Sequence, residues 1–263
     1  MPSLAQLIAE FDPAQAFEPP ADWYQGRTVY GGLSAALAVQ HCLHSMAPDL
    51  PPLKSAQISF VGPATGALRF VTTLLRRGKS VVSVAVDCLS GDTPAVRAAL
   101  TFAQARPGSI VHDFSQPPTV APPGDCQPFN TEELGVVPAF LRNFEIRQAG
   151  GAQPLSGATH PELLFWMRHR DARDVDPAVA LITIADAMPP AVMASFTEPA
   201  PVSSMAWSFD LPQPATPGEW FLLRAFSRQA GNGYSLQDME IWNEAGRSVL
   251  QGRQSVAVFI RAC

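Results

Sequence analysis

Hydrophobic and polar positions divide the chain into two similar series of elements. An apolar helical segment at 33–46 is followed by segments that alternate as β-strands do, separated by short turns of Gly, Ser, Pro and Arg. A second apolar helical segment at 176–190 is followed by the same pattern. The predicted strands lie at 53–61, 68–75, 80–89 and 94–105 in the first series and at 202–211, 219–228, 234–243 and 247–260 in the second. The segment 94–105 is rich in alanine, which favours a helix, but its place after three strands favours a fourth.

Three other segments complete the pattern. Residues 3–11 are predicted to form a short amphipathic helix, and 140–147 and 162–170 to form strands ahead of the second long helix. Between the two series, 106–138 contains seven prolines with Gly, Ser and Gln, which indicates a linker. We expect it to be largely extended and draped over a surface.

The two series align with each other as an internal repeat. Ile58-Ser59-Phe60 matches Trp207-Ser208-Phe209, with residue 209 lying 149 positions after residue 60, and Val96 matches Val249 at a spacing of 153. The expected fold class is therefore α+β, with two repeats of a long helix wrapped by a curved antiparallel sheet. Edge-to-edge pairing of the two sheets would remove two exposed edges. The predicted divisions are an N-terminal repeat at 1–105, a linker at 106–138 and a C-terminal repeat at 139–263.

One carboxylate interrupts the second long helix. Asp176 can cap its start, Pro177 suits the first helical position, and Pro189-Pro190 ends it. Asp186 lies among residues that are otherwise apolar, where an unpaired charge is costly, so it should have partners or a raised pKa. Either property marks a candidate functional group. The alternative is a structural carboxylate that caps a kink before Pro189.

Composition and charge narrow the possible partners. The 263 residues are 47% hydrophobic and 16% charged, with a formal net charge of −5 and scattered basic residues. This argues against nucleic acid and against a polybasic membrane anchor, and no apolar run reaches the ~18 residues of a membrane span. The first residues do not read as a secretion signal. The four cysteines, Cys42, Cys88, Cys126 and Cys263, form no C-x-x-C pair, so a reduced cytoplasmic chain is the simplest interpretation, with one or two disulfides as the alternative.

Motifs for other chemistries are missing from the sequence. His41 and His44 have helical spacing but no visible third ligand, so no metal site is predicted. No G-x-S-x-G elbow, G-x-G-x-x-G loop or P-loop is present, and no cofactor is expected.

Several segments, in their order and spacing, resemble the acyl-CoA thioesterase II family, which has the double hotdog arrangement of two sheet-wrapped helices. The segment 26–32, GRTVYGG, is similar to its G-x-x-(F/Y)-G-G motif, and 165–168, FWMR, followed by Asp176-Pro177, is similar to its W-(hydrophobic)-R strand and helix start. The segment 203–208, SSMAWS, stands where the family has Thr-(hydrophobic)-D-H-S. The glycine at 246 and the run from 249 to 254 resemble its closing G-x-(hydrophobic)-V-A…Q.

The resemblance implies a site of three side chains. Position by position it gives Asp186, Ser204 and Gln254, which in this family orient and activate one water molecule. Ser204 stands in place of a common threonine, which keeps the hydroxyl but not the stiffness of a β-branched side chain. Gly31 and Gly32, at the start of the first long helix, offer free N–H groups and the positive end of the helix dipole, which suits an oxyanion site. The resemblance further implies an acyl-CoA substrate and a homo-oligomer.

Other interpretations of these residues stay open at this stage. Ser204 could be an ordinary strand serine, Gln254 could face solvent, and Gly31-Gly32 could be only a tight turn. The alternative function is a non-catalytic acyl or acyl-CoA binding protein on the same fold. A hydratase acting on enoyl thioesters would need an Asp/His pair, and neither His41 nor His44 stands at a suitable place. The sequence does not indicate the length or type of the acyl group.

Overall fold

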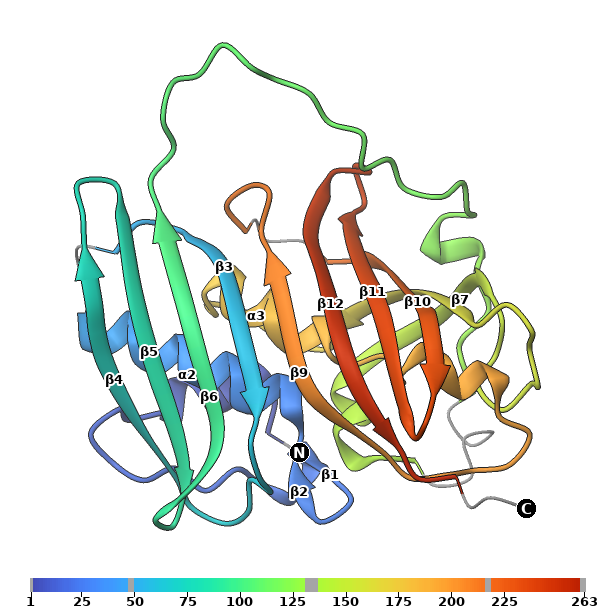
Figure 1. The fold of residues 1–263 in the computed structure, drawn as a ribbon, viewed down its shortest axis with the longest axis horizontal. Coiled ribbons are helices and arrows are strands. Elements are labelled where there is room, and N and C mark those ends of the chain that lie inside the picture. Colours follow the sequence, from blue (N-terminus) through green and yellow to red (C-terminus); the bar gives the residue numbers. More distant parts are fainter. Residues whose placement is uncertain (1, 47–49, 131–136, 216–218, 261–263) are drawn as a thin grey trace.

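One large antiparallel sheet forms the framework of the protein (Figure 1). The structure, a computed structural model, describes residues 2–46, 50–130, 137–215 and 219–260. Ten strands hydrogen-bond in the order β4-β5-β6-β3-β9-β12-β11-β10-β8-β7. Their bounds are β3 (Leu53–Phe60), β4 (Leu68–Arg77), β5 (Val81–Ser90), β6 (Thr93–Ala103), β7 (Phe144–Gly151), β8 (Glu162–His169), β9 (Val202–Asp210), β10 (Phe221–Gly231), β11 (Tyr234–Asn243) and β12 (Ser248–Val258). A separate two-stranded ribbon is formed by β1 (Tyr24–Gln25) and β2 (Thr28–Val29).

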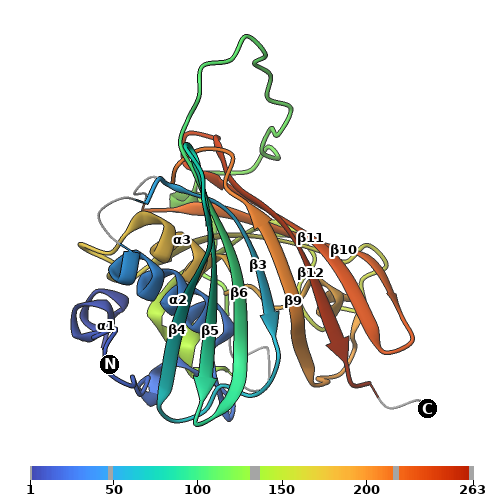
Figure 2. The same cartoon turned by 60° about the vertical axis from the view of Figure 1, so that its left-hand side comes forward.

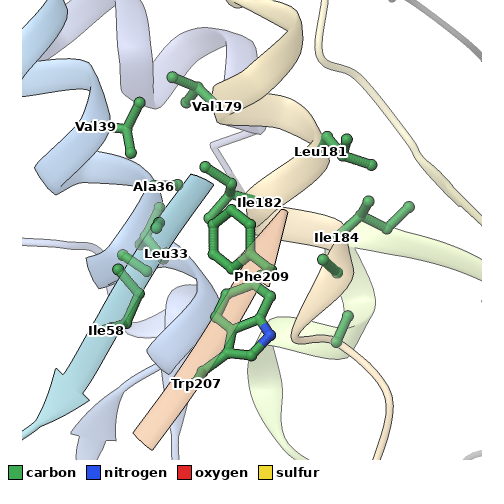
Figure 3. Packing of buried hydrophobic residues seen from close by; sticks show 14 of the residues in the cluster. Leu33, Ala36, Val39, Ile58, Val179, Leu181, Ile182, Ile184, Trp207 and Phe209 are labelled. Carbon is green, nitrogen blue, oxygen red and sulfur yellow. The ribbon is translucent and has the colours of Figure 1, made fainter. Parts of the chain in front are cut away.

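Both central helices lie on the same face of the sheet, which curves around them (Figure 2). They are α2 (Gly31–Met46) and α3 (Pro177–Ala185), while the short α1 (Leu4–Glu10) lies outside them. The helices pack directly on each other, and Figure 3 shows Val39 of α2 near Val179 and Ile182 of α3, above the side chains of β3 and β9. Alanine-rich α2 can approach its neighbours closely, and its residues 32–42 are all buried.

The two halves of the sheet repeat the same strand order. Each helix is followed by four strands, ordered β4-β5-β6-β3 after α2 and β10-β11-β12-β9 after α3, and the halves meet where β3 pairs with β9. Ile58 lies directly opposite Trp207 in that pairing, the residue with which the sequence repeat aligns it. A residue that faces its own counterpart marks a two-fold relation between the halves. The predicted edge-to-edge pairing is confirmed, and β8 and β7 extend the second half beyond the repeat.

The prediction of one long helix in each half is only half right. The helix α2 has 16 residues, but α3 has nine and ends at Ala185 instead of reaching Pro189-Pro190. Asp186 is the C-cap residue of α3, with φ −89° and ψ 4°, so it stands just outside the helix. A last, tighter turn closes there, because the Ala187 N–H donates to the Ile184 carbonyl three residues back.

A second boundary also differs from prediction. Residues 139–143 form the short 3₁₀ helix η4 (Ala139–Asn143), and β7 begins only at Phe144. The Asn143 side chain fixes this turn, since its Nδ2 donates to the carbonyls of Phe140 (3.2 Å) and Asp22 (3.0 Å).

The proline-rich linker is extended, and its later part covers the outer face of the sheet. The Trp242 indole N–H donates to the Ser115 carbonyl (2.8 Å), and the Trp166 indole N–H donates to the Ala121 carbonyl (2.9 Å). Arg147 adds a hydrogen bond to the Pro123 carbonyl (2.8 Å). We call residues 115–126 the strap. The expectation of a draped linker is confirmed for the strap, whereas 131–136 lie outside the described residues.

Two further properties bear on the sequence-based expectations. None of the described helices is long and apolar enough to cross a membrane. Cys42, Cys88 and Cys126 are buried free thiols, and Cys263 lies outside the described residues.

Candidate active site

A cavity of about 520 Å³ lies where α2, the end of α3, β9 and β12 meet. Asp186, Ser204, Gln254 and Gly31 all line it, so the structure brings together four of the five residues predicted from the sequence. Apolar side chains form much of the remaining wall, among them Phe60, Val96, Phe140, Leu141, Met188 and Met193. Among the described residues that line the cavity, Asp186 is the single ionisable side chain.

Asp186 is held by donors from two directions. Gln254 Nε2 donates to its Oδ1 at 2.8 Å, and the backbone N–H of Gly32 also hydrogen-bonds to the carboxylate. Removal of water by the surrounding protein raises the pKa of Asp186 to about 7, although the Gln254 and Gly32 hydrogen bonds act in the opposite direction. A carboxyl group with a pKa near neutrality is ionised in part of the population at physiological pH, and the ionised form can accept a proton.

Gly31 allows the start of α2 to approach this carboxylate. A Cβ at position 31 would lie 2.9 Å from Asp186 Oδ2 and 3.1 Å from the Phe60 ring, so no other residue fits without displacement. The Ser34 hydroxyl donates to the Gly31 carbonyl (2.9 Å) and steadies this first turn.

Gly32 lies behind the cavity wall. It is buried, does not line the cavity, and its N–H already faces Asp186. A Cβ at position 32 would collide with the Tyr30 ring. The lack of a side chain at position 32 therefore allows the close packing behind the site.

Tyr30 ties the two helices together behind the site. Its hydroxyl donates to the Thr183 carbonyl at 2.7 Å in the last turn of α3, and its ring stacks on Phe140 at 3.9 Å. Burial, together with the Asp186 charge, raises the pKa of Tyr30 well above its usual value, so the phenol stays a proton donor.

Ser204 faces the cavity because β9 contains a bulge. Ala206 pairs with Ser255 of β12, but Ser204 pairs with the next residue, Val256, which leaves Met205 as the extra residue. Strict alternation would put Ser204 on the face opposite to the buried Trp207, whereas the extra residue returns it to the inner face. Ser204 is half-buried at the cavity wall.

Gln254 points into the protein, so its solvent-facing alternative is wrong. The side chain is 2% exposed and lies opposite Gln237 on β11 and Trp207 on β9. Its Oε1 accepts a hydrogen bond from Gln237 Nε2 at 2.8 Å. Gln237 was missed at the level of sequence, although a polar residue at an inward position of a strand, between Ser235 and Met239, was a usable signal.

The histidines considered from the sequence lie elsewhere. His41 contacts the Thr72 hydroxyl at 2.8 Å, and His44 contacts Gln40 at 3.2 Å. Within the described part of the chain, no three His, Cys, Asp or Glu side chains gather in a way that could hold a metal ion.

The antiparallel sheet wrapped around its helices defines a hotdog-fold protein, and solved structures with this fold are similar along nearly the whole chain. A protein of unknown function with a hot dog fold from Alicyclobacillus acidocaldarius is 20% identical with a TM-score of 0.83, covering 93% of this chain and 92% of its own. The tesB protein of Mycobacterium avium subs paratuberculosis is 17% identical (TM-score 0.75; coverage 92% and 90%). The acyl-CoA thioesterase II TesB2 of Mycobacterium marinum is 20% identical (TM-score 0.72; coverage 95% and 98%).

The family is shown by the sequence itself. Residues 19–103 match the acyl-CoA thioesterase N-terminal domain, and residues 121–258 match the acyl-CoA thioesterase C-terminal domain. The chain therefore belongs to the acyl-CoA thioesterase family, as the resemblance predicted. A comparison with curated proteins gave no match.

Proposed function

We propose that this protein hydrolyses acyl-CoA thioesters to a free acid and CoA, with Asp186, Ser204 and Gln254 acting on one water molecule. The observation that carries the proposal is the position of Asp186, a carboxyl group with a pKa of about 7 that is the one ionisable side chain among the described cavity-lining residues. The largely apolar wall suits an acyl chain, and the family match supports a thioester as substrate.

In the proposed reaction Asp186 is the general base. The Ser204 hydroxyl and the second N–H of Gln254 Nε2 hold a water molecule, and ionised Asp186 takes its proton as the water oxygen attacks the thioester carbonyl carbon. The carbonyl π bond opens to an oxyanion. When it re-forms, the C–S bond breaks and the CoA thiolate leaves, with its proton returned from Asp186 or from solvent. A thiolate leaves readily, so no strong general acid is required.

We assign the oxyanion to the N-terminus of α2, through the N–H of Gly31. This residue lines the cavity at the positive end of a 16-residue helix. The sequence predicts Gly32 for the same oxyanion site, but we propose that Gly32 donates to Asp186, because its N–H faces that carboxylate.

The direct test is release of the CoA thiol, followed with a thiol reagent across acyl-CoA substrates of different chain length and branching. We expect turnover with at least one class, and a loss of about 10²–10⁴ in kcat for Asp186→Asn, as is typical when a general base is removed. A loss below about tenfold would exclude Asp186 as the base.

The second candidate is an acyl or acyl-CoA binding protein without catalysis, which the same apolar cavity would permit. Calorimetry that detects acyl-CoA binding, in a preparation that releases no thiol, would favour it. The hydratase alternative finds no histidine among the described residues of the cavity wall.

Two further proposals concern the repeats and the assembly of the protein. We propose that the repeats span 1–105 and 139–263 on either side of the linker at 106–138, and that the protein is a homo-oligomer. Light scattering coupled to gel filtration measures the second directly, and a mass of 28.2 kDa would contradict it.

A further inference from the structure

A series of hydrogen bonds leads from the backbone of residue 191 to Asp186. The Ala191 N–H donates to Gln237 Oε1 at 2.7 Å, Gln237 Nε2 donates to Gln254 Oε1 at 2.8 Å, and Gln254 Nε2 donates to Asp186 Oδ1 at 2.8 Å. Gln237 and Gln254 are opposite each other on β11 and β12, and each is 2% exposed. Two primary amides with so little exposure are unusual, because each needs partners inside the protein.

The direction of this series is set at its far end. A side-chain amide can be turned to exchange its oxygen and nitrogen, but a backbone N–H can only donate. The Ala191 N–H therefore selects the oxygen of Gln237, which leaves the Gln237 nitrogen for Gln254 and the Gln254 nitrogen for Asp186. Reversing either amide would put a donor against a donor and leave buried groups unsatisfied, at about 1–3 kcal/mol each.

We propose that Gln237 is a positioning residue, which holds the amide of Gln254 with its nitrogen toward Asp186 and so keeps that carboxylate an acceptor, ready to take a proton from water. The inference rests on the proposed function for its catalytic meaning. Its structural content, the direction of the Gln254 amide, does not depend on which substrate binds. Gln237 acts through Gln254 and lies outside the cavity wall.

The titration of Asp186 reports whether the Gln254 amide is held in this direction. We call this arrangement of Gln237, Gln254 and Asp186 the lock. In the locked arrangement Gln254 offers a donor only, which favours the ionised carboxyl over the protonated one. If Gln254 were free to turn, its oxygen could accept a hydrogen bond from the protonated carboxyl, and protonation would become easier.

The other groups around Asp186 do not titrate in the relevant range. They are the backbone of Gly31 and Gly32 from α2, Phe60 from β3, Ser204 from β9, and the Tyr30 phenol, whose hydroxyl is bonded to the Thr183 carbonyl. No second charged side chain lines the cavity in the described chain. A change in the Asp186 midpoint therefore follows from its hydrogen bonds or from a charge that is introduced.

The test compares Gln237→Glu, Gln237→Met and the control Gln251→Glu. An ionised glutamate at 237 can only accept hydrogen bonds, from Ala191 and from Gln254, so the Gln254 side-chain amide rotates and directs its oxygen toward Asp186, whereas a protonated glutamate can donate to Gln254 as glutamine does. Methionine has a similar length and makes neither hydrogen bond. Gln251 lies exposed on β12, so its substitution adds the same charge outside the series.

The main readout is the ¹³C NMR titration of the Asp186 carboxyl carbon, assigned with Asp186→Asn. We expect Gln237→Glu to raise the midpoint by about one unit or more, Gln237→Met to raise it by less, and Gln251→Glu to leave it as in the unmodified protein. An unchanged midpoint in Gln237→Met would overturn the proposal, because this variant removes both hydrogen bonds of residue 237 and adds no charge.

Kinetics supply the second readout and separate the two proposals. A midpoint one unit higher leaves about tenfold less carboxylate at pH 6, so kcat of Gln237→Glu should fall about tenfold there and much less at pH 9, with little change in KM. A loss of kcat that is the same at every pH contradicts the lock. If the unmodified protein hydrolyses no acyl-CoA, the proposed function fails, while the NMR midpoints still decide the role of Gln237.

Discussion

Gln254 Nε2 lies 2.8 Å from Asp186 Oδ1, and this hydrogen bond joins β12, the last strand in the sequence, to the end of α3. The two residues are 68 positions apart in the sequence and meet because β12 runs through the middle of the sheet, next to β9. Asp186 and Gln254 thus form one unit, in which the amide donates to the carboxyl group. The activity of this site should depend on pH, on the Ser204 hydroxyl and on the close approach of α2 to Asp186.

We expect activity to rise with pH through the Asp186 midpoint. Burial raises the pKa of Asp186 to about 7, so the base is mostly protonated below pH 6 and mostly ionised above pH 8. The pH profile of kcat/KM should therefore climb with an apparent midpoint near 7 and then level off. A profile that is flat from pH 5 to pH 9 would contradict the assignment.

The same shift predicts a pH-dependent stability difference. The folded protein keeps a proton on Asp186 up to about pH 7, which the unfolded chain releases near pH 4, so the free energy of unfolding falls over this window as pH rises. Asp186→Asn lacks this titration. Relative to the unmodified protein, the variant should gain up to about 4 kcal/mol between pH 4 and pH 7 and nothing more above pH 8. Urea denaturation at each pH measures the difference.

The Ser204 hydroxyl should be required in its inward position. Ser204→Ala removes one hydrogen bond to the attacking water and should lower kcat about 10- to 100-fold. Ser204→Thr keeps the hydroxyl and should retain activity within about threefold, because the β-branched side chain suits a strand. The control is Ser208→Ala, an exposed serine on the same strand, which should behave like the unmodified protein. Equal activity of Ser204→Ala and Ser208→Ala would exclude the hydroxyl from the reaction.

Replacement of Gly31 should damage the site with little effect on the rest of the fold. In Gly31→Ala the new methyl group would lie 2.9 Å from Asp186 Oδ2, which must move. Because small displacements of reacting groups are costly, we expect kcat to fall about 10- to 100-fold. Gly108→Ala is the matched control, since a Cβ there meets nothing within 4 Å. Full activity of Gly31→Ala would show that the start of α2 is not part of the reaction.

The strap should contribute to stability and not to catalysis. Trp242→Phe and Trp166→Phe each delete one indole hydrogen bond to the strap, worth about 1 kcal/mol, and the double variant should lose about twice that in the free energy of unfolding. Neither tryptophan lines the cavity, so kcat should stay within about twofold. In the unmodified protein, proteases should cut the exposed residues 110–114 and spare the strap at 115–126. In the double variant, limited proteolysis should also cut within the strap. Unchanged stability of the double variant would show that the strap only rests on the sheet.

Local patterns in the sequence were sufficient for the strands and for their repeated order. Alternation predicted the four strands after each helix, and the match of residues 58–60 with 207–209 predicted a repeat whose two sheets pair edge to edge, although not that β3 and β9 are the strands that meet. Asp186 could be recognised as a candidate because it is the one charged residue within an otherwise apolar segment of the sequence. The end of α3 was misplaced, since the tightened turn that closes at Ala187 leaves no mark in the composition.

Other features of the site could not be predicted from the sequence, because they depend on the pairing of strands that are distant in the chain. The inward direction of Ser204 follows from a bulge in β9, which is defined only relative to its partner β12. The Gln237–Gln254 contact requires the register between β11 and β12. That Gly32 lies behind the cavity wall and beside the Asp186 carboxylate follows from the packing of α2 against α3, which the sequence does not show.

The junction between the halves carries a consequence for the working protein. Five residue pairs join β3 to β9, and across this junction Gly31 from one half reaches Asp186 from the other. A fragment or partly melted form that keeps only one half would therefore hold a base without its helix terminus, or the reverse. On heating, we expect hydrolysis to stop at the temperature at which β3 separates from β9, even if each half of the sheet is still folded.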